Sequence, residues 1–195
     1  MKEERLALVI IDMQKDFVLP EAPLRIAGAA GTLPAIRRLL DAFRAEKRPV
    51  IHVIREHRTD GVDVEAFRME LFTRQGGFAV PGTRGVEIVD ELKPLEGEYV
   101  LVKRRFSAFM QTELDFMLRR LGVTRLVVCG TQYPVCIRTT IFDALALGYD
   151  VTSVVDATSA QTEEVAASNI RDIAAMGVTC QSVADFLAER GKSGG

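Results

Sequence analysis

Six apolar residues in an unbroken run, Leu6 to Ile11, constrain the fold of this chain more than any other feature of its sequence. A run of this kind, with several β-branched residues, is typical of a strand buried on both faces, as in a parallel sheet covered by helices. Asp12 ends the run, so we expect its carboxylate at the carboxyl edge of the sheet, where open α/β folds bind ligands. A purely structural role for Asp12, in a turn or as a cap, explains its position equally well.

Strand-like and helix-like segments alternate along the rest of the chain. Short apolar runs predict further strands over 49–54, 99–102, 126–129, 150–155 and 178–183. Helical spacing predicts helices over 33–46, 112–121, 162–176 and 184–189, one that begins at or beside Cys136, and short helical turns within 64–72 and 86–92. The predicted fold class is α/β, a three-layer αβα sandwich with a central, mostly parallel sheet of about six strands and helices on both faces. We expect one domain over 1–195, with 191–195 as a frayed tail.

Composition excludes several classes of partner. The formal net charge is only -2, which gives no indication of a nucleic-acid or membrane surface. The three cysteines, an odd number, fit a reducing compartment better than a disulfide framework, so we expect a cytoplasmic protein. The apolar run that follows the charged N-terminus is too short for the core of a signal peptide or for a membrane span.

The segment 125–146 places a cysteine in a position suited to chemistry. An apolar run breaks at Gly130, Pro134 follows, and helical spacing then begins at or beside Cys136. A thiol at a helix start lies near free backbone N–H groups, which favour the thiolate and can hold a developing oxyanion. A cysteine among apolar residues is more often an inert core residue, and this is how we interpret Cys129 and Cys180.

Three predicted strand ends present Asp12, Lys103 and Cys136 to the same edge of the sheet. Cys136 must lose a proton to attack carbon, Asp12 can accept that proton, and Lys103 lowers the pKa of the thiol. On this basis Asp12→Asn should raise the pKa at which Cys136 is alkylated. Taken alone, Lys103 is equally well explained as a lysine extending to solvent from a strand end.

A long irregular segment over about 59–85, with several glycines and Pro81, separates the second and third predicted strands. Segments of this length in a compact domain are usually functional, often a lid or a pocket wall. The alternative is a surface excursion that carries one short helix.

Three sequence blocks add a family resemblance. The segments 8–17, 103–109 and 130–136 look like the signature blocks of the isochorismatase-like cysteine hydrolases, which include nicotinamidases, N-carbamoylsarcosine amidases and related amidohydrolases. The segments 81–83 and 156–159 also resemble connecting pieces of that family, so the resemblance extends over nearly the whole chain.

The resemblance implies specific roles for residues of this chain. Asp12, Lys103 and Cys136 would form the catalytic triad. A cis peptide bond between Thr131 and Gln132 would direct the N–H groups of Gln132 and Cys136 into an oxyanion hole. Candidate residues of the substrate pocket are Phe17, Arg55 and Tyr133.

The chain departs from one branch of that family. The nicotinamidase branch resembles a metal site built from Asp-x-His after the second strand and a further histidine, whereas this chain reads Arg55-Glu56-His57-Arg58. Its other histidine, His52, falls inside a predicted strand. Too few ligands remain, so we expect no metal, no cofactor and no action on nicotinamide.

The leading functional hypothesis is a cysteine hydrolase that cleaves a C–N bond of a small amide or carbamoyl substrate through a thioester. The retained Cys136 favours this reaction over isochorismatase-type cleavage of a vinyl ether, which is the first alternative; a catalytically silent scaffold of the same fold is the second. The sequence does not support a nucleotide-binding domain, because it has no Gly-x-Gly-x-x-Gly pattern. It does not support a thiol redox protein either, because it has no Cys-x-x-Cys pair. The expected partners are a small-molecule substrate and further copies of the chain, in a dimer or tetramer.

Overall fold

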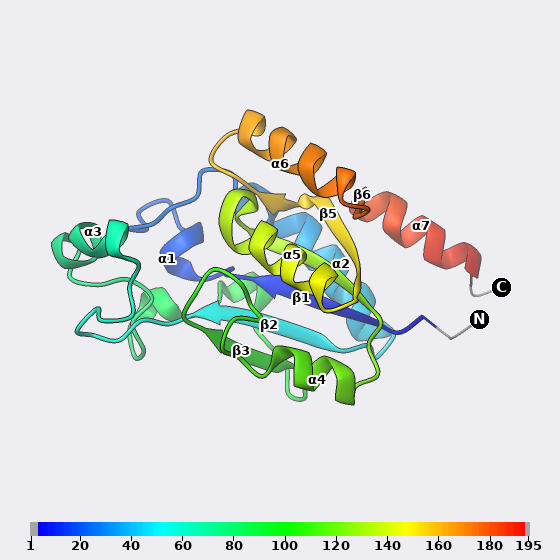
Figure 1. Cartoon of the computed structure of the whole chain (residues 1–195), viewed down its shortest axis with the longest axis horizontal. Coiled ribbons are helices and arrows are strands. Elements are labelled where there is room, and N and C mark those ends of the chain that lie inside the picture. Colours follow the sequence, from blue (N-terminus) through cyan, green and yellow to red (C-terminus); the bar gives the residue numbers. More distant parts are fainter. Residues whose placement is uncertain (1–3, 194–195) are drawn as a thin grey trace.

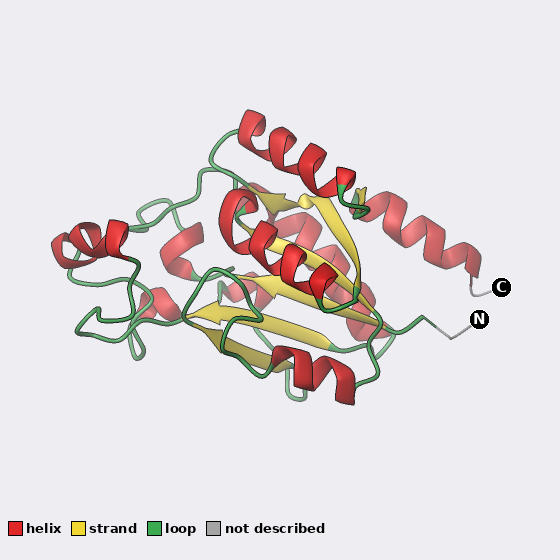
Figure 2. Cartoon of the chain, in the orientation of Figure 1, coloured by secondary structure: helices red, strands yellow, loops and turns green. Residues whose placement is uncertain are grey.

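The computed structural model describes residues 4–193, and a six-stranded sheet runs through its centre (Figures 1 and 2). The strands are β1 (Leu6–Ile11), β2 (Val50–Arg55), β3 (Tyr99–Lys103), β4 (Arg125–Thr131), β5 (Asp150–Ser159) and β6 (Thr179–Gln181). Their order in the sheet is β3-β2-β1-β4-β5-β6, and each strand is parallel to its neighbours. All strands therefore end at one edge, as the sequence predicted.

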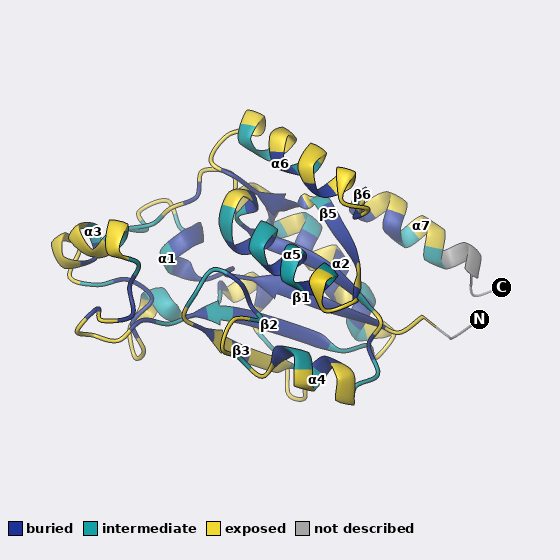
Figure 3. Ribbon diagram, in the orientation of Figure 1, coloured by how far each residue is buried: buried dark blue, intermediate teal, exposed yellow. Residues whose placement is uncertain are grey.

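Helices cover both faces of this sheet, which confirms the predicted three-layer sandwich. The helices are α1 (Lys15–Val18), α2 (Leu33–Ala45), α3 (Met69–Arg74), α4 (Leu114–Arg120), α5 (Arg138–Ala146), α6 (Glu163–Ala175) and α7 (Val183–Ser193). Leu8 and Ile10 of β1 belong to a core shared with α2 and α7, whereas Val9 and Ile11 belong to a core shared with α4, α5 and α6. The central strand β1 is accordingly buried on both sides (Figure 3), which is why its sequence is apolar at every position.

The strand β5 is longer than predicted, and the cause is a change of register against β4. Val128 lies opposite Ser153, but Gly130 lies opposite Thr158, so β5 continues past Asp156, where we had expected it to end. Gly130 has a φ of 112°, and a Cβ atom there would lie 2.2 Å from the carbonyl oxygen of Ile11. Only glycine fits this close approach of β4 to β1.

The segment 59–85 extends beyond the carboxyl edge of the sheet, at the end of the molecule to which the strand arrows point (Figure 1). It holds a 3₁₀ turn, Ala66–Arg68, which leads into α3. Phe72, Phe78 and Val80 of this segment pack with Phe17 of α1 in a small core separate from the two main ones. The helix in this segment is shorter than the predicted range of 64–72 and lies later in the sequence.

The structure differs from the prediction near both ends of the chain. The short helix α1 lies where the sequence indicated only a loop, because four residues are too few to show helical periodicity. The expected tail over 191–195 lies partly in α7 and otherwise outside the described residues. Within residues 4–193, no helix is both long and apolar enough to cross a membrane.

Candidate active site

Asp12 lies directly after β1, at the carboxyl edge of the sheet. Its φ is 52°, and its backbone N–H donates to the carbonyl of Val53 on β2 at 2.9 Å. The side chain is buried, and Oδ2 accepts a hydrogen bond from Lys103 Nζ at 2.8 Å. The other oxygen, Oδ1, has no hydrogen-bond partner among the described residues, although buried carboxylate oxygens are normally satisfied. Since Asp12 also lines a cavity, this carboxylate has capacity left to accept a proton.

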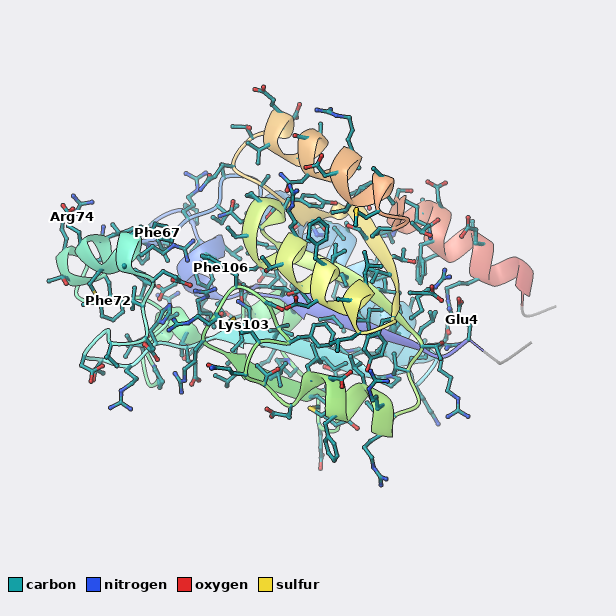
Figure 4. All side chains as sticks on the ribbon, in the orientation of Figure 1. Glu4, Phe67, Phe72, Arg74, Lys103 and Phe106 are labelled. Atoms are coloured by element: carbon teal, nitrogen blue, oxygen red, sulfur yellow. The ribbon has the colours of Figure 1, made fainter. Side chains whose placement is uncertain are left out.

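Lys103, labelled in Figure 4, is the last residue of β3. Its side chain is fully buried. Besides Asp12, its Nζ lies 3.6 Å from the Sγ of Cys136 and 3.3 Å from the carbonyl of Arg105. The next two residues turn away from this cluster: the guanidinium groups of Arg104 and Arg105 contact the side chain and the backbone carbonyl of Asp63, respectively. The structure thus brings Lys103, and neither arginine, into contact with Asp12 and Cys136.

Cys136 lies in a π-helical turn, Tyr133–Ile137, that leads directly into α5. Burial raises the pKa of the Cys136 thiol, and the Asp12 carboxylate raises it further, while Lys103 and Arg55 act in the opposite direction. The sequence had led us to expect a thiol with a lowered pKa. That expectation is wrong, because burial and Asp12 outweigh the nearby cations. The thiol is therefore protonated at rest, and Asp12 is the adjacent group that can remove its proton.

The peptide bond between Thr131 and Gln132 is cis, as the family resemblance implied, and the prediction is confirmed. It joins the end of β4 to the turn that carries Cys136. The hydroxyl of Ser159 on β5 hydrogen-bonds to the Thr131 hydroxyl at 2.8 Å and ties this junction to the neighbouring strand. Thr131, Gln132 and Cys136 all line the same cavity.

The cavity beside Cys136 has a volume of about 270 Å³, small enough to select a small molecule. Its lining residues are Asp12, Phe17, Pro23, Leu24, Arg25, Ile26, Arg55, Arg68, Thr131, Gln132, Val135, Cys136 and Gln161. Phe17 and Arg55 line it, as expected.

Tyr133, the third candidate for the pocket, does not line the cavity. Its ring is fully buried in the core beneath α5, and its hydroxyl is 3.2 Å from that of Ser153. Burial raises the pKa of Tyr133 to about 12, so the phenol stays protonated. The turn that presents Cys136 to the cavity directs Tyr133 into the core, which corrects its assignment to the pocket.

Arg55, at the end of β2, is more closely involved with the thiol than the sequence suggested. Its side chain is 1% exposed, and its guanidinium donates to Glu65 at 2.6 Å and lies 3.7 Å from the Sγ of Cys136. Glu65 and Arg68, both from the segment 59–85, were not among the predicted site residues. The length of that segment predicted a pocket wall, but nothing in its sequence singled out these two side chains.

Neither histidine belongs to a metal-binding cluster. The Nε2 of His52 pairs with Glu98 at 2.9 Å, away from the cavity lining. His57 packs edge-on against Phe72 and Phe78, and its Nδ1 lies 3.4 Å from Asp63. Within residues 4–193, no three His, Cys, Asp or Glu side chains are grouped so as to hold a metal ion. The residues present do not fit a site of the nicotinamidase type.

Comparisons with known proteins show the family to which this chain is similar. The isochorismatase domain family matches residues 6–185. A probable inactive nicotinamidase of Arabidopsis thaliana is 41% identical over 186 residues, covering 94% of this chain and 95% of that protein. The ureidoacrylate amidohydrolase RutB of Rhizobium rhizogenes is 32% identical, covering 81% and 72%. A crystal structure of an isochorismatase family protein from Desulfovibrio vulgaris is 57% identical, with a TM-score of 0.91 and coverage of 95% and 100%.

Proposed function

Because the chain belongs to the isochorismatase family of hydrolases, we propose that it hydrolyses the C–N bond of a small amide or carbamoyl compound through a thioester on Cys136. One observation carries this proposal: the Sγ of Cys136 lies 3.6 Å from Lys103 Nζ, Lys103 pairs with Asp12 at 2.8 Å, and the thiol and the carboxylate open onto one small cavity. A nucleophile, a base and an orienting cation are thereby in contact.

The reaction begins with transfer of the Sγ proton to Asp12, as Sγ attacks the carbonyl carbon and the carbonyl π electrons move to oxygen. The backbone N–H groups of Gln132 and Cys136 stabilise the resulting oxyanion. Asp12 then returns the proton to the nitrogen, the C–N bond breaks, and ammonia or an amine leaves. Water attacks the thioester with Asp12 as base, releasing the acid product and restoring the thiol.

Lys103 lies beside the negative charge both before and after this proton transfer. Before transfer, the cation pairs with the Asp12 carboxylate; after transfer, the same cation lies beside the Cys136 thiolate. The raised pKa of the thiol fits such a scheme, because the proton leaves sulfur only when a carbonyl carbon is present to accept the electron pair. Asp12 therefore acts as general base and then as general acid.

Nicotinamide is not the substrate that we propose. His57 is enclosed by aromatic rings, and the described residues lack the ligand cluster on which the nicotinamidase-type site depends. The Arabidopsis relative, named a probable inactive nicotinamidase, is consistent with this view. The alternatives remain the cleavage of a vinyl ether and a catalytically silent scaffold.

For assembly and location, our prediction remains a homo-oligomer in the cytoplasm.

Mass spectrometry of the intact protein tests the proposal directly. Incubation with a panel of small amides, ureas and carbamates should release ammonia, and rapid acid quenching should reveal an acyl adduct on Cys136. The Cys136→Ala variant should lose both signals while keeping the wild-type melting temperature, with a loss of activity of about a thousandfold or more. The Cys180→Ser variant is the matched control and should behave like the wild type. Turnover in Cys136→Ala would rule out the thioester mechanism.

A further inference from the structure

Two arginines at the cavity share one carboxylate. Glu65 Oε1 accepts a hydrogen bond from Arg55 at 2.6 Å, while the Arg68 guanidinium approaches Glu65 Oε2 only to 3.6 Å. Burial opposes the charge on Glu65, but the Arg55 guanidinium, with smaller contributions from a backbone N–H and from Arg68, holds the pKa of Glu65 below its usual range. Glu65 is thus a charged partner committed to Arg55, and one positive charge remains uncompensated.

The Arg68 guanidinium is fixed in place without using its hydrogen-bonding capacity. It lies 5.1 Å from the ring centroid of Phe67 and 5.2 Å from that of Phe106, two rings that come from different segments and whose centroids are 6.5 Å apart (Figure 4). Its side chain is only 16% exposed, and no hydrogen bond to another described residue engages its N–H groups. Aromatic contact holds a guanidinium by its face and leaves the N–H fork at its edge for an acceptor.

The cavity as a whole is positively charged. Arg25, Arg55 and Arg68 line it, and among the described residues Asp12 is the one carboxylate in its lining, already paired with Lys103. Between these charges the wall is apolar, formed by side chains such as Phe17 and Val135. A partly buried arginine that lacks hydrogen-bond acceptors is costly unless a ligand supplies them. Burial lowers the pKa of Arg68, because its charged guanidinium is partly removed from water.

We propose that the substrate carries a carboxylate beside its scissile amide or carbamoyl group, and that Arg68 determines this specificity by binding the carboxylate. The inference rests on the proposed function, since it places the substrate in the same cavity. A planar carboxylate matches the N–H fork of arginine with two parallel hydrogen bonds. Arg55, held by Glu65 beside the thiol, and Arg25, exposed at the cavity, add to the positive potential that attracts an anion.

The test compares ligands that differ in a single charge. Succinamate and succinamide have nearly the same shape, as do malonamate and malonamide, but only the first of each pair carries a carboxylate. Calorimetry with the Cys136→Ala variant measures binding without turnover. As a second readout, each compound is tested in the wild-type chain for protection of Cys136 against iodoacetamide.

We expect the anion of at least one pair to bind more than about tenfold more tightly than its diamide, since hydrogen bonds to charged groups are worth one to two powers of ten in affinity. Arg68→Gln in the same background should reduce this ratio at least about tenfold with little change for the diamide, and Arg68→Lys should retain part of it. The control is Arg74→Gln, which removes an exposed arginine at the far end of α3 (Figure 4) and should leave the ratio unchanged.

The two proposals fail in different ways. Three results would each overturn the assignment of Arg68. The first is equal affinity for the anion and the diamide. The second is that both anions fail to bind and also fail to protect Cys136. The third is an affinity ratio that is unaffected by Arg68→Gln. If amides are hydrolysed in that case, the proposed function stands. If the anions bind in an Arg68-dependent way but no amide is ever hydrolysed, the carboxylate site stands and the proposed reaction does not.

Discussion

Asp12 and Lys103 form a buried ion pair that spans three strands. Asp12 follows β1 and Lys103 ends β3, with β2 between them, yet Oδ2 and Nζ are 2.8 Å apart. Both side chains are almost completely removed from solvent. Because two buried charges stabilise each other, we expect the replacement of either residue alone to have consequences.

Replacing Lys103 with Met should impair both stability and chemistry. Asp12 would be left as a buried carboxylate without its cation, which should cost about 3 kcal/mol in the free energy of unfolding. The thiol pKa should rise further, since Lys103 is one of the two cations that lower it. Urea denaturation and the pH dependence of iodoacetamide labelling measure the two effects. The control is Arg104→Met, because Arg104 is half-exposed and pairs with Asp63 instead; equal effects in both variants would contradict the role of Lys103.

Asp12→Asn should separate reactivity from catalysis. The Asp12 carboxylate raises the pKa of Cys136, so its neutral isostere should lower that pKa and speed alkylation by iodoacetamide near pH 7. This reverses the sign expected from the sequence. Hydrolysis should nevertheless fall by at least about a hundredfold, because the general base is gone. Slower alkylation of the variant at every pH would show that the Asp12 carboxylate does not raise the pKa of Cys136.

His57 should make the stability of the protein depend on pH. Burial, and then the charge of Arg55, lower the pKa of His57 to about 4 from a usual value of 6.5. The unfolded state therefore binds the proton more readily than the folded state, so stability is lost as the pH falls below 6.5. Linkage gives a loss of about 2 kcal/mol between pH 7 and pH 5.

The contribution of His57 can be isolated with His57→Gln, which does not titrate. Urea denaturation measures the unfolding free energy of each protein. The value for the wild type minus the value for the variant should fall by about 2 kcal/mol as the pH falls from 7 to 5. His52 also has a lowered pKa from burial and contributes with the same sign in both proteins, so it cancels in the difference. A difference that stays constant with pH would mean that the His57 ring takes up its proton in the folded state without penalty.

Removal of divalent metals should leave the hydrolytic activity unchanged. Glu56 and His57 offer two ligands where zinc normally requires three or four, and His57 is enclosed by Phe72 and Phe78. Dialysis against a chelator, followed by the ammonia-release assay, measures this. A loss of activity that zinc or manganese restores would refute the prediction.

Much of this architecture follows from local patterns in the sequence. The apolar run of β1 predicted a strand buried on both faces, and the structure buries every residue from Leu6 to Ile11. Helical spacing predicted α2 and α6 to within a residue at either end, including Thr162, whose hydroxyl caps α6. Polar residues at strand ends then predicted which side chains share an edge, since in a parallel sheet all strands end on the same side. Asp12 and Lys103 were found in this way, and Cys136 from its position at the start of the helix that follows β4.

Only the tertiary structure decided how these groups influence one another. The sign of the pKa shift of Cys136 depends on the balance between burial, Asp12 and the two cations, which is a matter of distances that no spacing rule contains. The same holds for Tyr133. From the sequence it was assigned to the pocket, whereas in the structure it is enclosed by the core. Arg68 is the clearest case: it lies in an irregular segment without periodicity, and its role depends on rings from two separate segments and on a carboxylate already engaged by Arg55. The sequence thus determined the sheet, its layers and the edge at which the reactive groups meet, because those depend on short-range patterns of burial. The charge state and the specificity of the site were left to long-range packing, because electrostatic interactions depend on distance and solvent exposure in the folded chain.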